Sequence, residues 1–239
     1  IRAKSELFDF IRKNEGIVFI NTEDEVLNNM AKRFESAVLF PADDFTLKNS
    51  SPFVQYEDER GIAHNTHLVG KYNFMNASAA MTIGSFFGVT STNAQAAIDS
   101  YEPDNNRSQV IKLGSNTIIL DAYNANPDST SAALENLASF SDKKRIAMLG
   151  DMKELGEYSE EEHMKIFKLI GSYGKIDVYY VGVEYQHAIN NKSASTFPLV
   201  DDLISFLKKQ NPISDSVVLI KGSRSMTMEN LIKIEKIWN

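Results

Sequence analysis

The second half of the chain alternates short apolar runs with helical patterns, and this alternation constrains the fold more than any other feature. Four β-branched runs recur at intervals of about 30–40 residues. They cover Thr117–Leu120, Arg145–Leu149, Val178–Val181 and Val217–Ile220. A strand–helix–strand alternation favours a parallel sheet with right-handed crossover connections. We therefore predict an α/β fold with a mostly parallel sheet.

The segments between these runs carry helix signals. Ser159–Glu162 matches a capping box, and Pro127 suits the first turn of a helix. A turn-rich stretch at 101–106 separates this half from the first, where Gly16–Ile20 and Ser36–Phe40 read as short strands. We predict two domains, 1–101 and 102–239.

Composition and charge exclude several classes of protein. The 239 residues carry a net charge of −7, and no basic stripe suits a nucleic acid. The chain contains no cysteine, which removes disulfides and thiol nucleophiles. No apolar run is long enough to span a membrane, and no signal peptide precedes the first helical pattern. We expect a cytoplasmic protein that acts as a monomer.

Polar segments follow three of the four predicted strands of the second half. They are 121–127, 150–156 and Lys221–Arg224. In a parallel sheet, ligands bind outside the carboxyl ends of the strands, so these segments predict one site. A carboxylate at Asp121 would accept hydrogen bonds from ribose hydroxyls. Lys221 and Arg224 would hold a substrate carboxylate. An asparagine-rich turn at 123–126 is also common structural punctuation.

Two further candidates lie outside these segments. Asn73 and Asn76 share one face at a helix start, where carboxamides match the edge of adenine. A simple helix cap is the alternative for one of them. Arg107 follows the turn at 101–106 and would reach phosphate, and a solvated surface arginine is the alternative.

Taken in order, the motifs resemble those of the Mur ligases of peptidoglycan synthesis, and most closely the branch that adds D-alanyl-D-alanine. The matching segments are Gly70–Asn76 (with Tyr72 in place of the usual histidine), Tyr123–Pro127, Gly150–Gly156 with His163 downstream, and Lys221–Arg224 with Met228 and Glu229. The resemblance extends over most of the chain. Each motif is moderately specific, and the ordered set is much more so.

The resemblance implies a reaction and its substrates. ATP and Mg²⁺ would phosphorylate the terminal carboxylate of UDP-MurNAc-tripeptide, and the amine of D-Ala-D-Ala would attack the acyl phosphate. By register with the family, the ATP-binding residues would be Asn73, Asn76, Arg107, Asp121 and Tyr123, with Arg107 also catalytic. The dipeptide would lie against Asn124, Asn126, Lys221, Ser223 and Arg224.

The resemblance also assigns Lys4 and the two domains. Lys4 falls in the segment that carries the family's carbamylated lysine, whose carbamate oxygen suits Mg²⁺. An ordinary exposed helix lysine is the alternative. Residues 1–101 would be the C-terminal portion of a P-loop-type central ATP-binding domain, and 102–239 a Rossmann-like C-terminal domain. Because this sequence contains no Gly-x-x-x-x-Gly-Lys-[Ser/Thr] loop, we expect the chain alone to lack ligase activity.

Three other functions stay open at this point. A sister Mur ligase or a folylpolyglutamate-type ligase would use another amino acid on the same fold. A nucleotide-binding module without catalysis would share the site but not the reaction. A Rossmann-like interaction protein would bind no nucleotide at all.

Overall fold

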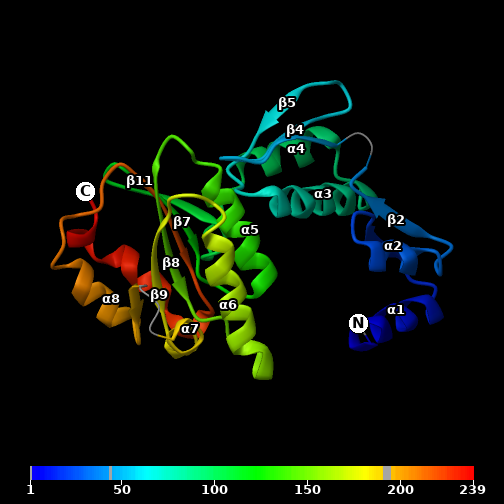
Figure 1. Cartoon of the computed structure of the whole chain (residues 1–239). Coiled ribbons are helices and arrows are strands. Elements are labelled where there is room, and N and C mark those ends of the chain that lie inside the picture. The colour runs from blue at the N-terminus through cyan, green and yellow to red at the C-terminus, as the bar shows by residue number, and fades with distance from the viewer. Residues whose placement is uncertain (1, 43–44, 191–194) are drawn as a thin grey trace. The chain divides into compact units, whose positions relative to one another are not determined.

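The computed structural model describes residues 2–42, 45–190 and 195–239, with side chains from residue 5 onward. The chain forms two compact units (Figure 1). One comprises Ile1–His67 with Lys71–Tyr101, and the other comprises Leu68–Gly70 with Glu102–Asn239. In the described residues, no helix combines the length and the apolar composition that a bilayer crossing needs.

The first unit combines helices with two small sheets. Strands β1 and β2 pair in parallel, and β3, β4 and β5 form an antiparallel sheet. The elements in order are α1 (Arg2–Lys13), β1 (Val18–Asn21), α2 (Glu25–Ala31), β2 (Ala37–Phe40), β3 (Thr46–Asn49), β4 (Gln55–Glu57), β5 (Ala63–Asn65), α3 (Lys71–Phe86) and α4 (Ser91–Ser100). The strands predicted at 16–20 and 36–40 are therefore present as β1 and β2.

Aromatic stacking and a partly buried polar network hold β4, β5 and α4 of this unit together. The ring of Tyr56 in β4 stacks on that of His64 in β5 with centroids 4.7 Å apart. The Tyr56 hydroxyl donates to Asp99 Oδ1 at 3.0 Å, and Asp99 Oδ2 lies 2.7 Å from His64 Nδ1. Burial, with the hydrogen bond to Asp99, raises the pKa of Tyr56 well above its ordinary value. Tyr56 is therefore a donor throughout the physiological range.

The second unit is built on a six-stranded sheet in the order β10-β9-β8-β11-β7-β6. All neighbouring strands are parallel except β6, which runs antiparallel to β7. The elements are β6 (Gln109–Leu113), β7 (Asn116–Asp121), α5 (Pro127–Ala138), β8 (Lys144–Gly150), η1 (Gly156–Tyr158), α6 (Ser159–Ile170), β9 (Asp177–Val181), α7 (Val183–Ile189), β10 (Ser195–Phe197), α8 (Val200–Leu207), β11 (Ser216–Lys221), η2 (Arg224–Met226), η3 (Met228–Lys233) and η4 (Glu235–Ile237). The predicted mostly parallel α/β sheet is confirmed.

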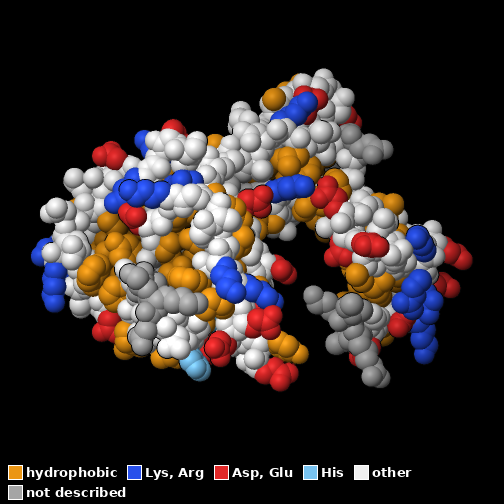
Figure 2. All heavy atoms as spheres, viewed as in Figure 1, with side chains coloured by type: hydrophobic (Ala, Val, Ile, Leu, Met, Phe, Trp, Pro, Cys, Tyr) orange, Lys and Arg blue, Asp and Glu red, His pale blue; other side chains and the backbone are white. Residues whose placement is uncertain are grey.

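Both faces of this sheet are covered, which explains the continuous apolar runs in its strands. Helices α5 and α6 lie side by side on one face, and α8 lies on the other (Figure 1). On the α8 face, Leu120, Met148 and Ile220 pack with Leu203 and Leu231 in one buried cluster. On the face of the molecule shown in Figure 2, lysine and arginine side chains lie in separate groups interspersed with acidic ones.

Of the two helix starts predicted from sequence, the one at Pro127 is confirmed and the capping box at Ser159 is not. Pro127 is the first residue of α5, as predicted, and Asn126 is its N-cap, with Oδ1 accepting from the Ser129 N–H at 2.8 Å. The predicted capping box at Ser159 is wrong. The N-cap of α6 is Tyr158, without a side-chain cap, and the Ser159 hydroxyl donates to Glu184 Oε2 at 2.7 Å. The Ser159 side chain therefore bonds to a residue distant in sequence and does not cap its own helix.

Candidate functional site

The carboxyl ends of β7, β11 and β8 lie next to one another in the sheet. Lys221 at the end of β11 is in register with Asp121 on one side and Leu149 on the other. The chain leaves β7 toward α5, which packs on one face, and leaves β11 toward η3, which packs with α8 on the opposite face. In α/β sheets, ligands typically bind at such a reversal, outside the carboxyl ends of the strands. The three predicted polar segments therefore meet at this edge.

A buried ion pair joins the ends of β7 and β11. Lys221 Nζ lies 2.5 Å from Asp121 Oδ2 and donates to the Asn124 carbonyl at 3.1 Å. The side chain of Lys221 is only 2% exposed, and that of Asp121 13%. Asp121 Oδ1 accepts from the Ser108 N–H at 3.2 Å. Lys221 and Asp121 thus have partners within the protein, and their predicted contacts with substrate and ribose stay predictions.

Arg107 lies in a segment of unusual backbone conformation. Asn106 and Ser108 on either side have φ values of 58° and 51°. Non-glycine residues adopt this left-handed region at a cost, and strained residues of this kind are enriched at functional sites. Two hydrogen bonds fix the segment to the end of β7, because the Asn106 carbonyl accepts from the Tyr123 N–H at 3.2 Å and the Ser108 N–H donates to Asp121.

Two arginines share the ring of Tyr123. The guanidinium carbon of Arg107 lies 3.9 Å from the ring centroid, and that of Arg224 lies 5.2 Å from it. All three residues are exposed. Among the described residues, neither guanidinium has an ion-pair partner. The edge of the sheet therefore presents two uncompensated cations around one aromatic ring.

The other predicted substrate residues divide between exposed and engaged groups. Asn124 is exposed, and its Oδ1 accepts from the Ala125 N–H at 2.8 Å. Asn126 is exposed but caps α5. Ser223 is buried, where its N–H donates to the Asp151 carbonyl and its Oγ accepts from the Lys153 N–H at 2.8 Å. All of these residues lie at one edge of the sheet, and their contacts with a substrate stay predictions.

The segment after β8 is fixed by Asp151, which is fully buried. Its two carboxylate oxygens accept from the N–H groups of Glu184 and Tyr185 in the first turn of α7, and Lys153 Nζ lies 3.0 Å away. Gly182, with a φ of 122°, leaves room for this carboxylate. An added Cβ there would lie 2.1 Å from Asp151 Cγ. Only glycine fits this position.

His163 secures the same segment from α6. Its Nε2 accepts from the Met152 N–H at 3.0 Å, and its Nδ1 lies 2.7 Å from the Ser159 carbonyl. These partners require a proton on Nδ1 and none on Nε2, so the imidazole is neutral. Burial lowers the pKa of His163, because desolvation penalises the charged ring. His163 has a structural role in this loop.

The remaining candidates belong to the first unit. Asn73 and Asn76 lie in the first turns of α3, where the Asn76 amide donates to Asn73 Oδ1 at 3.0 Å. Lys4 belongs to the first turn of α1, and its side chain lies outside the described residues. Within the described part of the chain, no three histidine or acidic side chains cluster as metal ligands. These residues do not provide a Mg²⁺ site by themselves.

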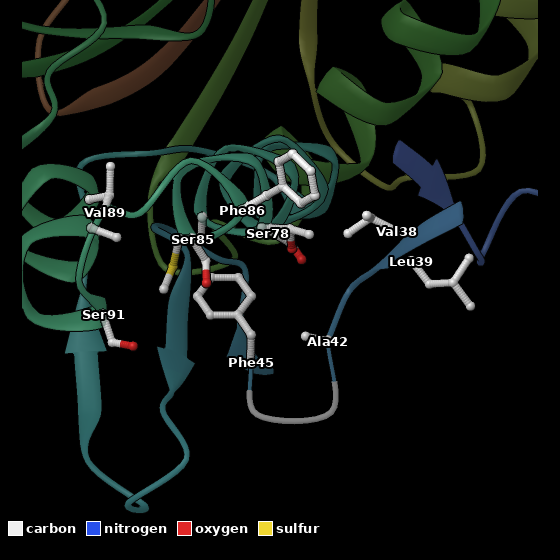
Figure 3. Close-up of a pocket in the computed structure, with 12 residues that line it drawn as sticks. Val38, Leu39, Ala42, Phe45, Ser78, Ser85, Phe86, Val89 and Ser91 are labelled. Atoms are coloured by element: carbon white, nitrogen blue, oxygen red, sulfur yellow. The ribbon is translucent and has the colours of Figure 1, made fainter. Parts of the chain in front are cut away.

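A separate pocket of about 380 Å³ lies in the first unit (Figure 3). Val38, Phe45 and Phe86 contribute its apolar wall, together with the hydroxyl side chain of Ser78. The described lining contains no charged side chain, so it lacks groups that hold phosphate. None of the predicted site residues lies in it.

Sequence reasoning missed the groups that act through the backbone. The Ser108 N–H on Asp121 and the two α7 N–H groups on Asp151 organise the edge, yet backbone donors have no residue-type signature. Gly182 is the one sequence feature that could have indicated the contact with Asp151, because a glycine between a strand and a helix often marks a place where another group approaches the backbone closely.

Comparison with known proteins is consistent with this geometry. Residues 106–224 match the family described as Mur ligase, glutamate ligase domain. The UDP-N-acetylmuramoyl-tripeptide–D-alanyl-D-alanine ligase of Haemophilus influenzae is 31% identical over 246 residues, which are 97% of this chain and 53% of that protein. The ligase of the same name from Treponema pallidum is 34% identical over 171 residues, 69% of this chain and 37% of that protein.

Solved structures show the same fold. MurF ligase from Thermotoga maritima in complex with ADP superposes with a TM-score of 0.76 at 21% identity, covering 92% of this chain and 53% of that chain. The chain belongs to the Mur ligase family, which confirms the resemblance drawn from its motifs. Within that family, the relatives described above are of the MurF type. The chain spans about half the length of the Haemophilus ligase.

We predict that Gly182→Ala strongly destabilises the second unit. The new Cβ would overlap the Asp151 carboxylate, and the φ of 122° is strained for any side chain. The free energy of unfolding should fall by about 3 kcal/mol or more, measured by urea denaturation. Gly174→Ala is the matched control, because Gly174 has a φ of 76° but only an ordinary contact nearby. Equal losses in both variants would contradict the steric account.

We also predict that His163 makes the free energy of unfolding decrease as the pH is lowered. The unfolded histidine takes up a proton at pH ~6.5, whereas folded His163 resists protonation because its pKa is lowered. Protons therefore favour the unfolded state, and the free energy of unfolding should decrease as pH drops below that value. His163→Gln should flatten this slope between pH 7 and 5, while exposed His187→Gln should leave it intact. An unchanged slope in His163→Gln would refute the assignment.

Proposed function

We propose that the whole protein is an ATP-dependent ligase that adds D-alanyl-D-alanine to UDP-MurNAc-tripeptide in peptidoglycan synthesis. The observation that carries the proposal is the assembly, at one sheet edge, of three of the segments that resemble the family's motifs: the ends of β7, β8 and β11 with the residues that follow them. Alignment of 97% of the chain with a ligase of that name supports it. We further propose that residues 1–101 belong to the central domain and that residues 102–239 form the C-terminal domain.

The proposed reaction has two steps. A carboxylate oxygen of the tripeptide attacks the γ-phosphorus of ATP, so that an O–P bond forms and ADP leaves. The amine of D-Ala-D-Ala then attacks the acyl carbon, and an amide forms as inorganic phosphate leaves and the amine loses a proton. The protein contributes mainly by positioning these groups and neutralising phosphate charge.

The proposed nucleotide would contact the edge of the second unit. Arg107 and Arg224 present guanidinium groups without carboxylate partners, and such groups bind phosphate oxygens well. Asp121 would accept from the ribose, and Tyr123 would contact the nucleotide. In the first unit, Asn73 and Asn76 would bind adenine through their carboxamides.

The dipeptide and metal assignments rest on the family register. Asn124, Asn126, Ser223 and Arg224 would line the position of D-Ala-D-Ala, and Lys221 would act there through Asp121 and the Asn124 carbonyl. The described residues do not supply a Mg²⁺ site, so Mg²⁺ stays a proposal resting on Lys4 as a carbamate. When bound, the ion would neutralise phosphate charge.

Phosphate release tests the proposal most simply. The protein encoded by the complete reading frame is supplied with MgATP and UDP-MurNAc-tripeptide, with and without D-Ala-D-Ala. We expect release that depends on the dipeptide, with the amide product confirmed by mass spectrometry. Arg107→Ala should reduce kcat/KM by about 100-fold, in line with the loss of a phosphate-binding arginine.

Other outcomes of the same assay would contradict the proposal. Release with a single amino acid and a shorter UDP-peptide would indicate a sister ligase. Release with a folate and glutamate would indicate a folylpolyglutamate-type enzyme. Binding of ATP without release under any of these conditions would indicate a non-catalytic module.

A further inference from the structure

The cluster formed by Arg107, Tyr123 and Arg224 has a property that its members lack individually. Two guanidinium groups approach one ring, and no described carboxylate compensates either of them. Each guanidinium is attracted to the face of the ring, and repulsion between the like charges opposes this attraction. An anion bound by both arginines would remove that repulsion.

Each arginine is carried by a loop whose backbone is already fixed. Arg107 lies between two left-handed residues that are hydrogen-bonded to the end of β7. Arg224 follows Ser223, which is fixed by the Asp151 carbonyl and by the Lys153 N–H. The two loops come from segments more than a hundred residues apart in sequence. Tyr123 is the side chain that contacts both guanidinium groups.

We propose that Tyr123 is a positioning residue that holds Arg107 and Arg224 as one anion subsite for a phosphate-bearing ligand. The inference rests on the proposed function, which supplies phosphate as the anion. The aromatic ring restricts both side chains to orientations over its surface, so that less freedom is lost when an oxyanion binds. The Tyr123 hydroxyl has no partner in the described part of the chain, and the ring itself therefore carries the role.

The subsite makes a specific demand on its ligand. A guanidinium donates two parallel N–H groups, which match the oxygens of phosphate. Two such groups suit a dianion or trianion, such as a pyrophosphate moiety, better than a single carboxylate. Pyrophosphate is therefore the probe for testing the subsite independently of any ligase activity.

The test follows the arginine Nε–Hε signals of this chain by NMR during a pyrophosphate titration. We expect the Arg107 and Arg224 signals to shift with one shared dissociation constant. Tyr123→Leu should remove the ring-current shift of the Arg107 signal and weaken pyrophosphate binding by roughly five- to tenfold. Tyr123→Phe, which keeps the ring, should preserve both properties.

Controls separate positioning from a general loss of structure. Tyr158→Leu removes another exposed aromatic side chain of the same unit and should leave the titration unchanged. Arg224→Gln should weaken pyrophosphate binding while the Arg107 ring-current shift persists. Equal melting temperatures of Tyr123→Leu and Tyr123→Phe would show that the fold is intact.

Two results would overturn the inference. One is pyrophosphate affinity that is the same in Tyr123→Leu and the unchanged chain. The other is independent titration of the two arginines with different dissociation constants. The proposed function fails separately: a full-length protein without dipeptide-dependent phosphate release would refute it even if both arginines bind pyrophosphate together. Normal release combined with either overturning result would refute the subsite alone.

Discussion

The buried ion pair between Lys221 and Asp121 is the interaction on which the candidate site depends. It joins β11 to β7, and each partner holds another segment: Lys221 the Asn124 carbonyl, and Asp121 the Ser108 N–H. Burying two charges is costly, and the additional hydrogen bonds offset part of that cost. Removing one partner of such a pair typically costs about 3–5 kcal/mol because the other charge is left uncompensated.

The polar residues of the edge form two groups, one buried and one exposed. Lys221, Asp151 and His163 are buried and hold strands, loops and helices in place. Arg107, Tyr123 and Arg224 are exposed, and among the described residues the two arginines lack carboxylate partners. A site that handles phosphate needs both groups, because cations aimed at an anion are effective only when their positions are fixed in advance.

Much of the second unit could be predicted from sequence, for a physical reason. β7, β8, β9 and β11 are covered on both faces or largely buried, so their residues form continuous apolar runs. β6 and β10 were not predicted. β6 carries the polar residues Gln109 and Lys112 on an edge, and β10 has only three residues, too few for a periodic signal.

The sequence predicts where the candidate site lies, but it does not predict how the side chains of the site are oriented. Asp121, Tyr123, Ser223 and Arg224 were placed at one edge because parallel strands end together. Their orientations depend on register and on tertiary partners, which a motif does not contain. Lys221 looks like a substrate-binding lysine in sequence, yet its place in β11 directs it to Asp121. In the same way, Ser159 bonds to Glu184 rather than capping its own helix.

Hydrogen exchange at the Ser108 and Tyr123 amides, compared between the unchanged chain and Lys221→Met, tests the central role of the ion pair most directly. Lys144→Met is the matched control, because Lys144 and Asp177 form an exposed pair between neighbouring strands, of a kind that contributes little. If Lys221 organises the edge, Lys221→Met will lose protection at both amides while Lys144→Met will not. Unchanged protection at Ser108 and Tyr123 in Lys221→Met would contradict that role.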